Sequence, residues 1–209
     1  MFTHLNLLSI GEIADLLAQP VPVERKTGME MPEPSARRKA GVLIPFIREQ
    51  ESWKILYIRR AESVRDPHSG QVAFAGGMWE ESDASLAATA LREAHEEIGL
   101  APADVELLGE LPHHHSLGGI EITPVVATMP WPYSLNPEAA EVAHVFSIPL
   151  YWLADPDNYQ VEQRGQAVGK SIFYKPYNNE ILWGATARMT LSLIAHLTRD
   201  AALPEIIGI

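Results

Sequence analysis

The chain has 209 residues, of which 46% are hydrophobic, so it can form one domain with a core of ordinary size. Its formal net charge of −11 argues against a nucleic-acid binder, because nucleic-acid backbones are held by clustered Lys and Arg side chains. The charge does not exclude a small anionic ligand, since a bound divalent cation can reverse the local sign. The sequence contains no cysteine, which excludes disulfides, thiolate metal sites and cysteine nucleophiles. With no apolar run of roughly 18–20 residues and no basic secretory start, we expect a cytoplasmic protein that binds no membrane.

Residues 1–39 are expected to form a helix and a proline-rich arm ahead of a domain that spans 40–209. The sequence from Leu5 to Ala18 is typical of a short amphipathic helix that stops before Pro20. Its apolar side consists of Leu8, Ile13, Leu16 and Leu17. Residues 20–39 carry four prolines among charged residues, which indicates a linker or an arm lying over the surface.

Two strands are predicted at 41–47 and 53–59, joined by a polar turn. A short strand at 72–74 runs into the dipeptide Gly76-Gly77. A helix fits residues 83–98, with Ser82 or Asp83 as its N-cap and Gly99 as its C-terminal stop.

The second half of the chain is predicted to continue this alternation of strands and helices. Its expected elements are strands at 105–111, 120–129 and 142–148, a short helix at 149–153, a hairpin of 171–174 with 181–183, and a closing helix at 185–198. The inward side of the closing helix consists of Met189, Leu193, Ile194 and Leu197. A strand-rich body interrupted by helices predicts an α+β fold or an α/β/α sandwich.

The helix at 83–98 carries the clearest chemical signal. At about 100° per residue, its apolar side chains gather on one side and Glu93, Glu96 and Glu97 gather on another. Like charges at this spacing repel one another, and a hard divalent cation such as Mg²⁺ would relieve the repulsion. The alternative is a solvated acidic face. Two neighbours favour the metal site: Gly76-Gly77, whose backbone can approach a ligand closely, and Arg92, which can orient a carboxylate.

These residues resemble the box of the Nudix hydrolase family, in which a glycine and an acidic residue precede Arg-Glu-(aliphatic)-x-Glu-Glu-x-Gly. The matching positions here are Gly77, Asp83, Arg92, Glu93, Ala94, Glu96, Glu97, Gly99 and Leu100. Asp83 stands where Glu is usual, and one extra residue precedes Arg92. The resemblance implies an α+β fold of the Nudix type, an α/β/α sandwich with a mixed sheet. It also implies that Glu93 and Glu97 bind Mg²⁺ or Mn²⁺, with Glu96 nearby and the carbonyl of Gly77 completing the set.

The longer box is similar to that of the coenzyme A pyrophosphatase branch, and so is the sequence upstream of it. Arg60, Arg65, Gly70 and Phe74-Ala75-Gly76-Gly77 follow the outline of that branch, with Ala75 in place of its proline and one extra residue between Arg65 and Gly70. Trp183-Gly184-Ala185-Thr186-Ala187-Arg188 also resembles it. The resemblance implies that Arg60 and Arg65, and less so Arg59, hold substrate phosphates, and it places Phe74, Gly76 and Gly77 at the substrate. Ordinary ion pairs at the surface are the alternative for the arginines.

Three weaker signals remain. His113, His114 and His115 cannot all face one ion from a strand, so we expect exposed polar residues there. Glu141, just before a predicted strand, could bind metal or act as the general base, and Glu138 and Glu121 compete for that role. Trp152 and Trp183 are expected in the core or at its rim, although either could stack on adenine.

Together these patterns predict metal-dependent hydrolysis of coenzyme A or a derivative to 3′,5′-ADP and a 4′-phosphopantetheine product. Arg92 would orient Glu93, and Glu96 would complete the metal cluster or take part in proton transfer. One alternative is a Nudix enzyme for ADP-ribose, a dinucleoside polyphosphate or a nucleoside triphosphate. Another is a non-catalytic Nudix module that senses a nucleotide. The sequence leaves open a monomer or a homodimer.

Overall fold

The computed structural model describes residues 2–21, 38–64, 68–116, 119–163, 170–200 and 202–203. Arg65 and most of the expected proline-rich arm lie outside the described residues. Within these ranges, eight strands form one mixed sheet. They are β1 (Arg38–Glu49), β2 (Ser52–Arg60), β3 (Val72–Ala73), β4 (Gly76–Met78), β5 (Glu106–Glu110), β6 (His114–His115), β7 (Ile120–Thr128) and β8 (Val142–Pro149).

The centre of the sheet is the long strand β1. It runs parallel to β7, with Val42 opposite Pro124, and antiparallel to both β2 and β4 on its other edge. Strand β2 pairs with β8 along most of its length and with β3 near its C-terminal end, which places Arg59 opposite both Val72 and His144. The predicted turn between β1 and β2 is formed by Gln50 and Glu51, both with positive φ.

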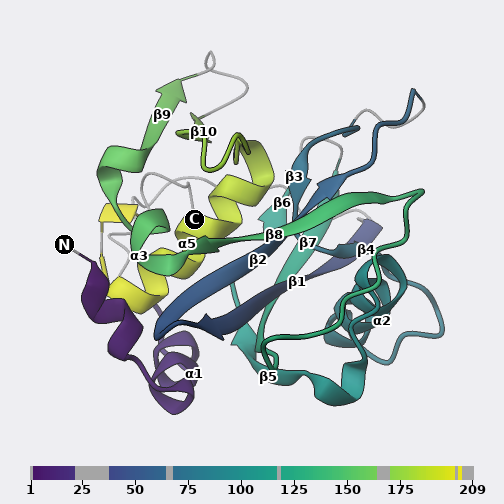
Figure 1. The fold of residues 1–209 in the computed structure, drawn as a ribbon, viewed down its shortest axis with the longest axis horizontal. Helices are drawn as coiled ribbons and strands as arrows, with labels where there is room; N and C mark the ends of the chain where they lie inside the picture. The colour runs from purple at the N-terminus through teal and green to yellow at the C-terminus, as the bar shows by residue number, and fades with distance from the viewer. Residues whose placement is uncertain are drawn as a thin grey trace.

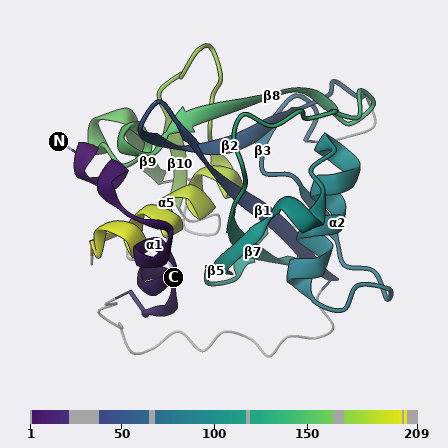
Figure 2. The same cartoon turned by 60° about the horizontal axis from the view of Figure 1, so that its bottom comes forward.

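Helices cover both faces of the sheet, so the predicted α/β/α sandwich with a mixed sheet is confirmed (Figures 1 and 2). Helix α2 (Leu86–Ile98) packs its alanines and Ile98 on one face, against Leu43 and Ile47 of β1. Helices α1 (Ile10–Ala18), α3 (Leu150–Leu153) and α5 (Gly184–Thr198) pack on the other, against Ile44 and Phe46. Successive strand side chains point to opposite faces, and this alternation fills two separate cores.

The predicted single helix at 5–18 is wrong in part, because two helices stand there. A 3-10 helix, η1 (Thr3–Leu7), comes first, and α1 begins only at Ile10. The cause is Ser9, whose side chain accepts a hydrogen bond from the amide of Glu12 (3.2 Å) while the Glu12 carboxylate accepts one from the amide of Ser9 (2.8 Å). This capping box starts a new helix. Ile13 and Leu17 are buried, as predicted.

The predicted hairpin of 171–174 with 181–183 is also wrong in its main pairing. Strand β10 (Lys170–Tyr174) pairs along its length with β9 (Tyr159–Gln163), an element that the sequence did not indicate. Residues 181–183 contribute one isolated bridge, between Phe173 and Trp183. The remaining short helices are η2 (Pro102–Asp104) and η3 (Pro156–Asn158). In the described part of the chain no helix is long and apolar enough to span a membrane.

Gly41 lets α2 lie close to the sheet. A Cβ built at Gly41 would stand 2.3 Å from the carbonyl oxygen of Leu86 and 3.1 Å from the amide nitrogen of Ala90. Both are backbone atoms of α2, so no side chain can move aside to make room. The absence of a side chain at position 41 therefore sets the distance between the helix and the sheet.

We predict that Gly41→Ala lowers the free energy of unfolding by roughly 3 kcal/mol, because the added methyl must push α2 away from β1. Urea titration followed by circular dichroism measures the change. Gly11→Ala is the matched control: a Cβ there meets nothing within 4 Å, so it should raise stability by roughly 0.5–1 kcal/mol through helix propensity. Equal effects of the two substitutions would contradict the close contact.

Candidate active site

Helix α2 begins later than predicted and ends where predicted. Its N-cap is Ser85, whose side chain accepts a hydrogen bond from the amide of Ala88 at 3.1 Å, and neither Ser82 nor Asp83 has that role. Gly99 ends the helix in the left-handed conformation, with φ of 71°. The expected cap Asp83 has a different partner, Arg92.

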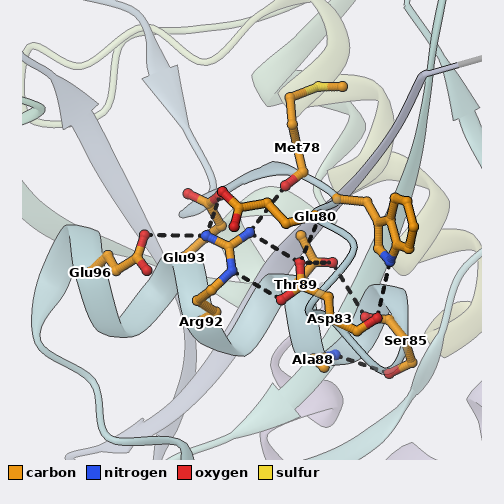
Figure 3. A network of polar contacts seen from close by, with 10 residues as sticks. Met78, Glu80, Asp83, Ser85, Ala88, Thr89, Arg92, Glu93 and Glu96 are labelled. Carbon is orange, nitrogen blue, oxygen red and sulfur yellow. Dashed lines mark hydrogen bonds and ion pairs between the residues drawn. The ribbon is translucent and has the colours of Figure 1, made fainter.

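Arg92 is the centre of a polar network that joins α2 to the loop before it (Figure 3). Its guanidinium donates to both carboxylate oxygens of Asp83, at 3.0 and 3.1 Å, in the bidentate geometry that makes such pairs strong. It also donates to the carbonyl of Met78 (3.1 Å) and to Glu93 (2.9 Å). Asp83 accepts two further hydrogen bonds, from the Thr89 hydroxyl (2.9 Å) and the Glu80 amide (3.1 Å).

The electrostatics of this network keep its groups charged. The hydrogen bonds from Arg92 lower the pKa of Asp83 to about 2, and the same pairing raises the pKa of Arg92. Because a charged Arg92 also contacts Glu93, the network fixes the direction of the first box carboxylate. The orienting role of Arg92 in catalysis stays a prediction.

Glu93 lies directly against the glycine bend. A Cβ built at Gly77 would fall 2.4 Å from the carboxyl carbon of Glu93, so only glycine leaves room for this side chain. Burial raises the pKa of Glu93, the nearby charges of Glu96 and Glu141 add to the rise, and Arg92 opposes it. A carboxylate in this position is stabilised by added positive charge.

Glu97 is buried, with 3% of the residue exposed, and its carboxylate accepts a hydrogen bond from the amide of Gly76 at 3.0 Å. The guanidinium of Arg60 lies 3.9 Å from its other oxygen. Burial raises the pKa of Glu97 to about 7, and the charges of Glu93 and Glu141 add to the rise while Gly76 and Arg60 oppose it. Glu97 is therefore a buried acid whose deprotonation near neutral pH requires a compensating positive charge.

The other two carboxylates of the prediction lie differently. Glu96, whose side chain is 57% exposed, points to Arg92, which donates to it at 3.2 Å (Figure 3). Of the three carboxylates expected in one small region, Glu93 and Glu97 are partly or fully buried, and the more exposed Glu96 lies at their edge. Glu141 stands just before β8, where its carbonyl accepts from the amide of Ala61 (2.8 Å), one residue after Arg60. Its charge acts on both Glu93 and Glu97.

Several predicted residues lie away from these carboxylates. Phe74 is a correction: we expected it at the substrate, but its ring is buried in the core and stacks on Tyr57 with centroids 4.9 Å apart. The buried ring of Phe74 holds in place the backbone segment that leads into Gly76. Glu121 pairs with His113 (3.3 Å), and the carboxylate of Glu138 accepts from the amide of Ala140 (3.3 Å). Trp152 packs against Tyr174 and Tyr177.

Of the three histidines, which were expected to be exposed, His113 and His115 are exposed and His114 is half-buried. His114 and His115 make up β6, a strand paired with β7, so their side chains point to opposite faces. Burial lowers the pKa of His114 to about 4, and nearby Arg188 and His115 add to this effect. The half-buried imidazole of His114 thus lies near the charge of Arg188 on α5.

The carboxylates suit a hard divalent cation bound through few protein ligands. Within the described ranges, no group of three or more His, Asp or Glu side chains is spaced to hold a metal ion unaided. Mg²⁺ typically uses one or two carboxylates and completes its shell with water and substrate phosphates. Glu93 and Glu97, with pKa values raised by burial and by their neighbours' charges, are the two candidates for such ligands.

Comparison with known proteins agrees with this site. The NUDIX domain model matches residues 37–164. A protein of Enterobacter sp. (strain 638) named "Uncharacterized Nudix hydrolase NudL" is 40% identical over 154 residues, which cover 72% of this chain and 78% of that protein. A protein of the same name from Photorhabdus laumondii is 37% identical over 167 residues, covering 76% and 87%. The crystal structure of a MutT/nudix family protein from Enterococcus faecalis covers 86% of this chain and 71% of its own, with a TM-score of 0.50 and 16% identity, and it supports the fold alone.

An acidic helix held against a glycine bend, with arginines beside it, suits a hydrolase of phosphate compounds that uses a divalent cation. The chain belongs to the Nudix family and is a Nudix hydrolase. Nudix hydrolases generally use divalent metal ions and act on small nucleotide-derived substrates.

Two groups that support this site were not found from the sequence. Thr89 reinforces Asp83, and Glu180 pairs with Arg59 at 3.1 Å. Thr89 lies one helical turn before Arg92, and this spacing could have suggested a shared partner. Glu180 lies 121 residues from Arg59, and no local pattern connects the two.

We predict that Glu97→Gln stabilises the metal-free protein in a pH-dependent way. The pKa of Glu97 is about 7 in the folded protein and near 4.5 in the unfolded chain. Between pH 4.5 and pH 7 the folded state therefore binds this proton more tightly than the unfolded state does. The wild type consequently loses stability as the pH rises through this range. Glutamine has no such penalty and can still accept from Gly76. In EDTA the variant should match the wild type near pH 4.5 and exceed it by roughly 3 kcal/mol at pH 8.

Urea titrations at several pH values measure this difference, and Glu96→Gln is the control because Glu96 is exposed. Excess Mg²⁺ should remove the advantage by stabilising only the wild type. A difference that does not change with pH would contradict the burial of an ionisable Glu97.

Proposed function

We propose that this Nudix hydrolase cleaves the diphosphate of coenzyme A or a derivative, giving 3′,5′-ADP and 4′-phosphopantetheine or its acyl form. The observation that carries the proposal is the position of Arg60, 3.9 Å from the metal-binding candidate Glu97. A guanidinium beside the metal ligands stands where phosphate oxygens of a bound diphosphate would lie, and its fork suits them. Arg60 is also the first arginine of the motif that resembles the coenzyme A branch.

The longer box supports the same assignment. Although one extra residue separates Asp83 from Arg92, the two side chains still meet in a bidentate pair across the start of the helix, which Ser85 caps. The longer spacing between Asp83 and Arg92 therefore leaves the hydrogen bonds between these two side chains intact. This fits a branch that has the longer box as a regular feature.

Glu93 and Glu97 would hold Mg²⁺ or Mn²⁺, with Glu96 and the Gly77 carbonyl as further candidates. When bound, the cation neutralises the diphosphate and lowers the pKa of the attacking water. Arg92 keeps Glu93 directed toward the Gly77 bend, and Arg60 holds a phosphate oxygen. Glu141, whose charge acts on both metal-binding candidates, would take the proton from the water as the water oxygen bonds to phosphorus and the bridging P–O bond breaks.

We predict that the purified protein with Mg²⁺ or Mn²⁺ cleaves coenzyme A faster than ADP-ribose, dinucleoside polyphosphates or nucleoside triphosphates. Glu97→Gln should fold normally and lose several orders of magnitude in kcat, since it removes a ligand of the cation. Product analysis by chromatography checks both points. Preference for another substrate would overturn the coenzyme A assignment, and near-normal turnover by Glu97→Gln would overturn the chemistry. Nucleotide binding without product would support the non-catalytic alternative.

The general base is tested separately by Glu141→Gln and the matched variant Glu138→Gln. We predict that Glu141→Gln lowers kcat by about 10²–10⁴-fold and leaves KM nearly unchanged, because the carboxylate acts on the water and not on substrate binding. Glu138→Gln should stay near wild type, since that side chain bonds the local backbone. The pH profile of kcat with Mg²⁺ shows the loss of the basic group. Equal kcat values in the two variants would remove Glu141 from the mechanism.

A further inference from the structure

An aromatic pair stands at the surface beyond the end of strand β2. The rings of Phe173 and Trp183 are parallel within 2°, with centroids 6.0 Å apart. Trp183 is 37% exposed and its neighbour Ile181 is 47% exposed, although both belong to a segment that is fixed at several points. Single exposed apolar residues are common at protein surfaces, so exposure alone decides nothing. What distinguishes this pair is its support and its position.

The support is a rigid turn. Tyr177 and Glu180 exchange two backbone hydrogen bonds, each of 2.9 Å, around Asn178 and Asn179. Both asparagines are in the left-handed region, with φ of 49° and 69°, which Asn tolerates better than most residues. On the far side of the turn, the amide of Tyr174 donates to the carbonyl of Leu182 at 2.8 Å. The backbone that leads into Trp183 is therefore held by hydrogen bonds within the turn and by one from Tyr174 to Leu182.

The position is set by Glu180. Its two carboxylate oxygens bind Arg59 (3.1 Å) and His144 (2.9 Å), which are directly opposite each other on β2 and β8. Arg60 follows Arg59 on β2 and is opposite Val142 of β8. Glu141 comes directly before Val142 in the sequence. The carboxylate thus fixes the turn to the two strands that carry a phosphate-binding candidate and the candidate base.

A second connection comes from α5, which starts directly after Trp183. The hydroxyl of Thr186 donates to the carbonyl of Val72 at 3.1 Å, and Val72 pairs with Arg59. Figure 1 shows the start of α5 beside β3. Trp183 is consequently held at the same end of the sheet as Arg60, although α5, which follows Trp183, covers the face opposite the one on which Arg60 contacts Glu97 of α2.

We propose that Trp183, supported by Phe173, stacks on the purine base of the substrate, and that Glu180 is the residue that positions this aromatic pair relative to Arg60. The inference rests on the proposed function in taking the substrate to be a nucleoside diphosphate derivative. An aromatic ring on a rigid support stacks on a base with little loss of side-chain freedom. The larger ring system of adenine gains more from stacking than uracil does, so the pair confers a preference for purines.

The test compares diphosphate substrates that carry adenine with matched ones that carry uracil. Trp183→Ala should raise KM for the adenine substrate roughly tenfold and change kcat by less than about twofold, and the uracil substrate should respond less. Trp183→Phe should retain most of the affinity. Tyr151→Ala is the matched control, because Tyr151 is exposed to a similar extent (38%) on α3. An unchanged KM, or equal losses for both bases, would overturn the proposal.

Glu180→Gln tests the positioning role. It keeps the shape of the side chain and weakens the bonds to Arg59 and His144, so KM for the adenine substrate should rise about two- to fivefold with the preference for adenine reduced. A merely structural role would lower the melting temperature and leave the ratio of the two KM values unchanged. Such a result would remove Glu180 from the proposal.

Binding of adenosine 3′,5′-bisphosphate, measured by calorimetry, separates this inference from the proposed function, because this nucleotide has no anhydride to cleave. If coenzyme A is not hydrolysed but Trp183→Ala still weakens nucleotide binding roughly tenfold, the proposed function fails and the stacking role stands. If coenzyme A is hydrolysed and Trp183→Ala binds the nucleotide as tightly as the wild type, the stacking role fails alone. Should Trp183→Ala not fold, Trp183→Leu and Phe173→Leu carry the same comparison.

Discussion

The active site depends on the close contact between helix α2 and the glycine-containing strands beneath it. Gly41 lets the helix backbone approach β1, and Gly77 leaves space for the carboxylate of Glu93. Gly76 then offers its amide to Glu97 at 3.0 Å. A side chain at Gly41 would move the helix, one at Gly77 would displace the Glu93 carboxylate, and one at Gly76 would collide with the backbone of β1. The same contact that builds the core therefore brings two acids together in a place where water cannot solvate them fully.

That arrangement carries an electrostatic cost in the free protein, and the surrounding residues limit it without removing it. Arg92 is fully engaged by Asp83, Met78 and Glu93, so it orients Glu93 while remaining charged. Arg60 lies further from Glu97, at 3.9 Å, and the pKa of Glu97 still rises to about 7. A site of this kind favours a divalent cation, and it couples the binding of that cation to the loss of a proton.

Much of the fold could be predicted because its elements are marked by local signals. The apolar run of β1, the left-handed stop at Gly99 and the apolar face of α5 are all properties of neighbouring residues. The errors came from contacts between distant residues. Asp83 was expected to cap α2, but the guanidinium of Arg92, nine residues on, is a stronger partner for it, and Ser85 caps the helix instead. Closeness in sequence predicts that β10 pairs with 181–183. In the structure β10 pairs along its length with β9 instead.

The site shows the same division. The carboxylates and glycines were identified because the box is contiguous, and helical geometry put Glu93 and Glu97 on one side. Sequence spacing could not show that Glu96 turns outward to Arg92, or that Phe74 is held in the core by Tyr57. Nor could it show which of three acids, Glu121, Glu138 and Glu141, approaches the box. That choice depends on the pairing of β8 with β2, which joins residues more than 80 positions apart.

The most direct test of this account is the number of protons released when Mn²⁺ binds, measured by calorimetry in buffers of different ionisation enthalpy. If a buried Glu97 with a pKa of about 7 binds the ion, the protein should release at least about half a proton per ion at pH 7 and much less at pH 8.5. In Glu97→Gln the release at pH 7 should fall. A release that is the same at both pH values, or that is unchanged by the substitution, would contradict the central claim.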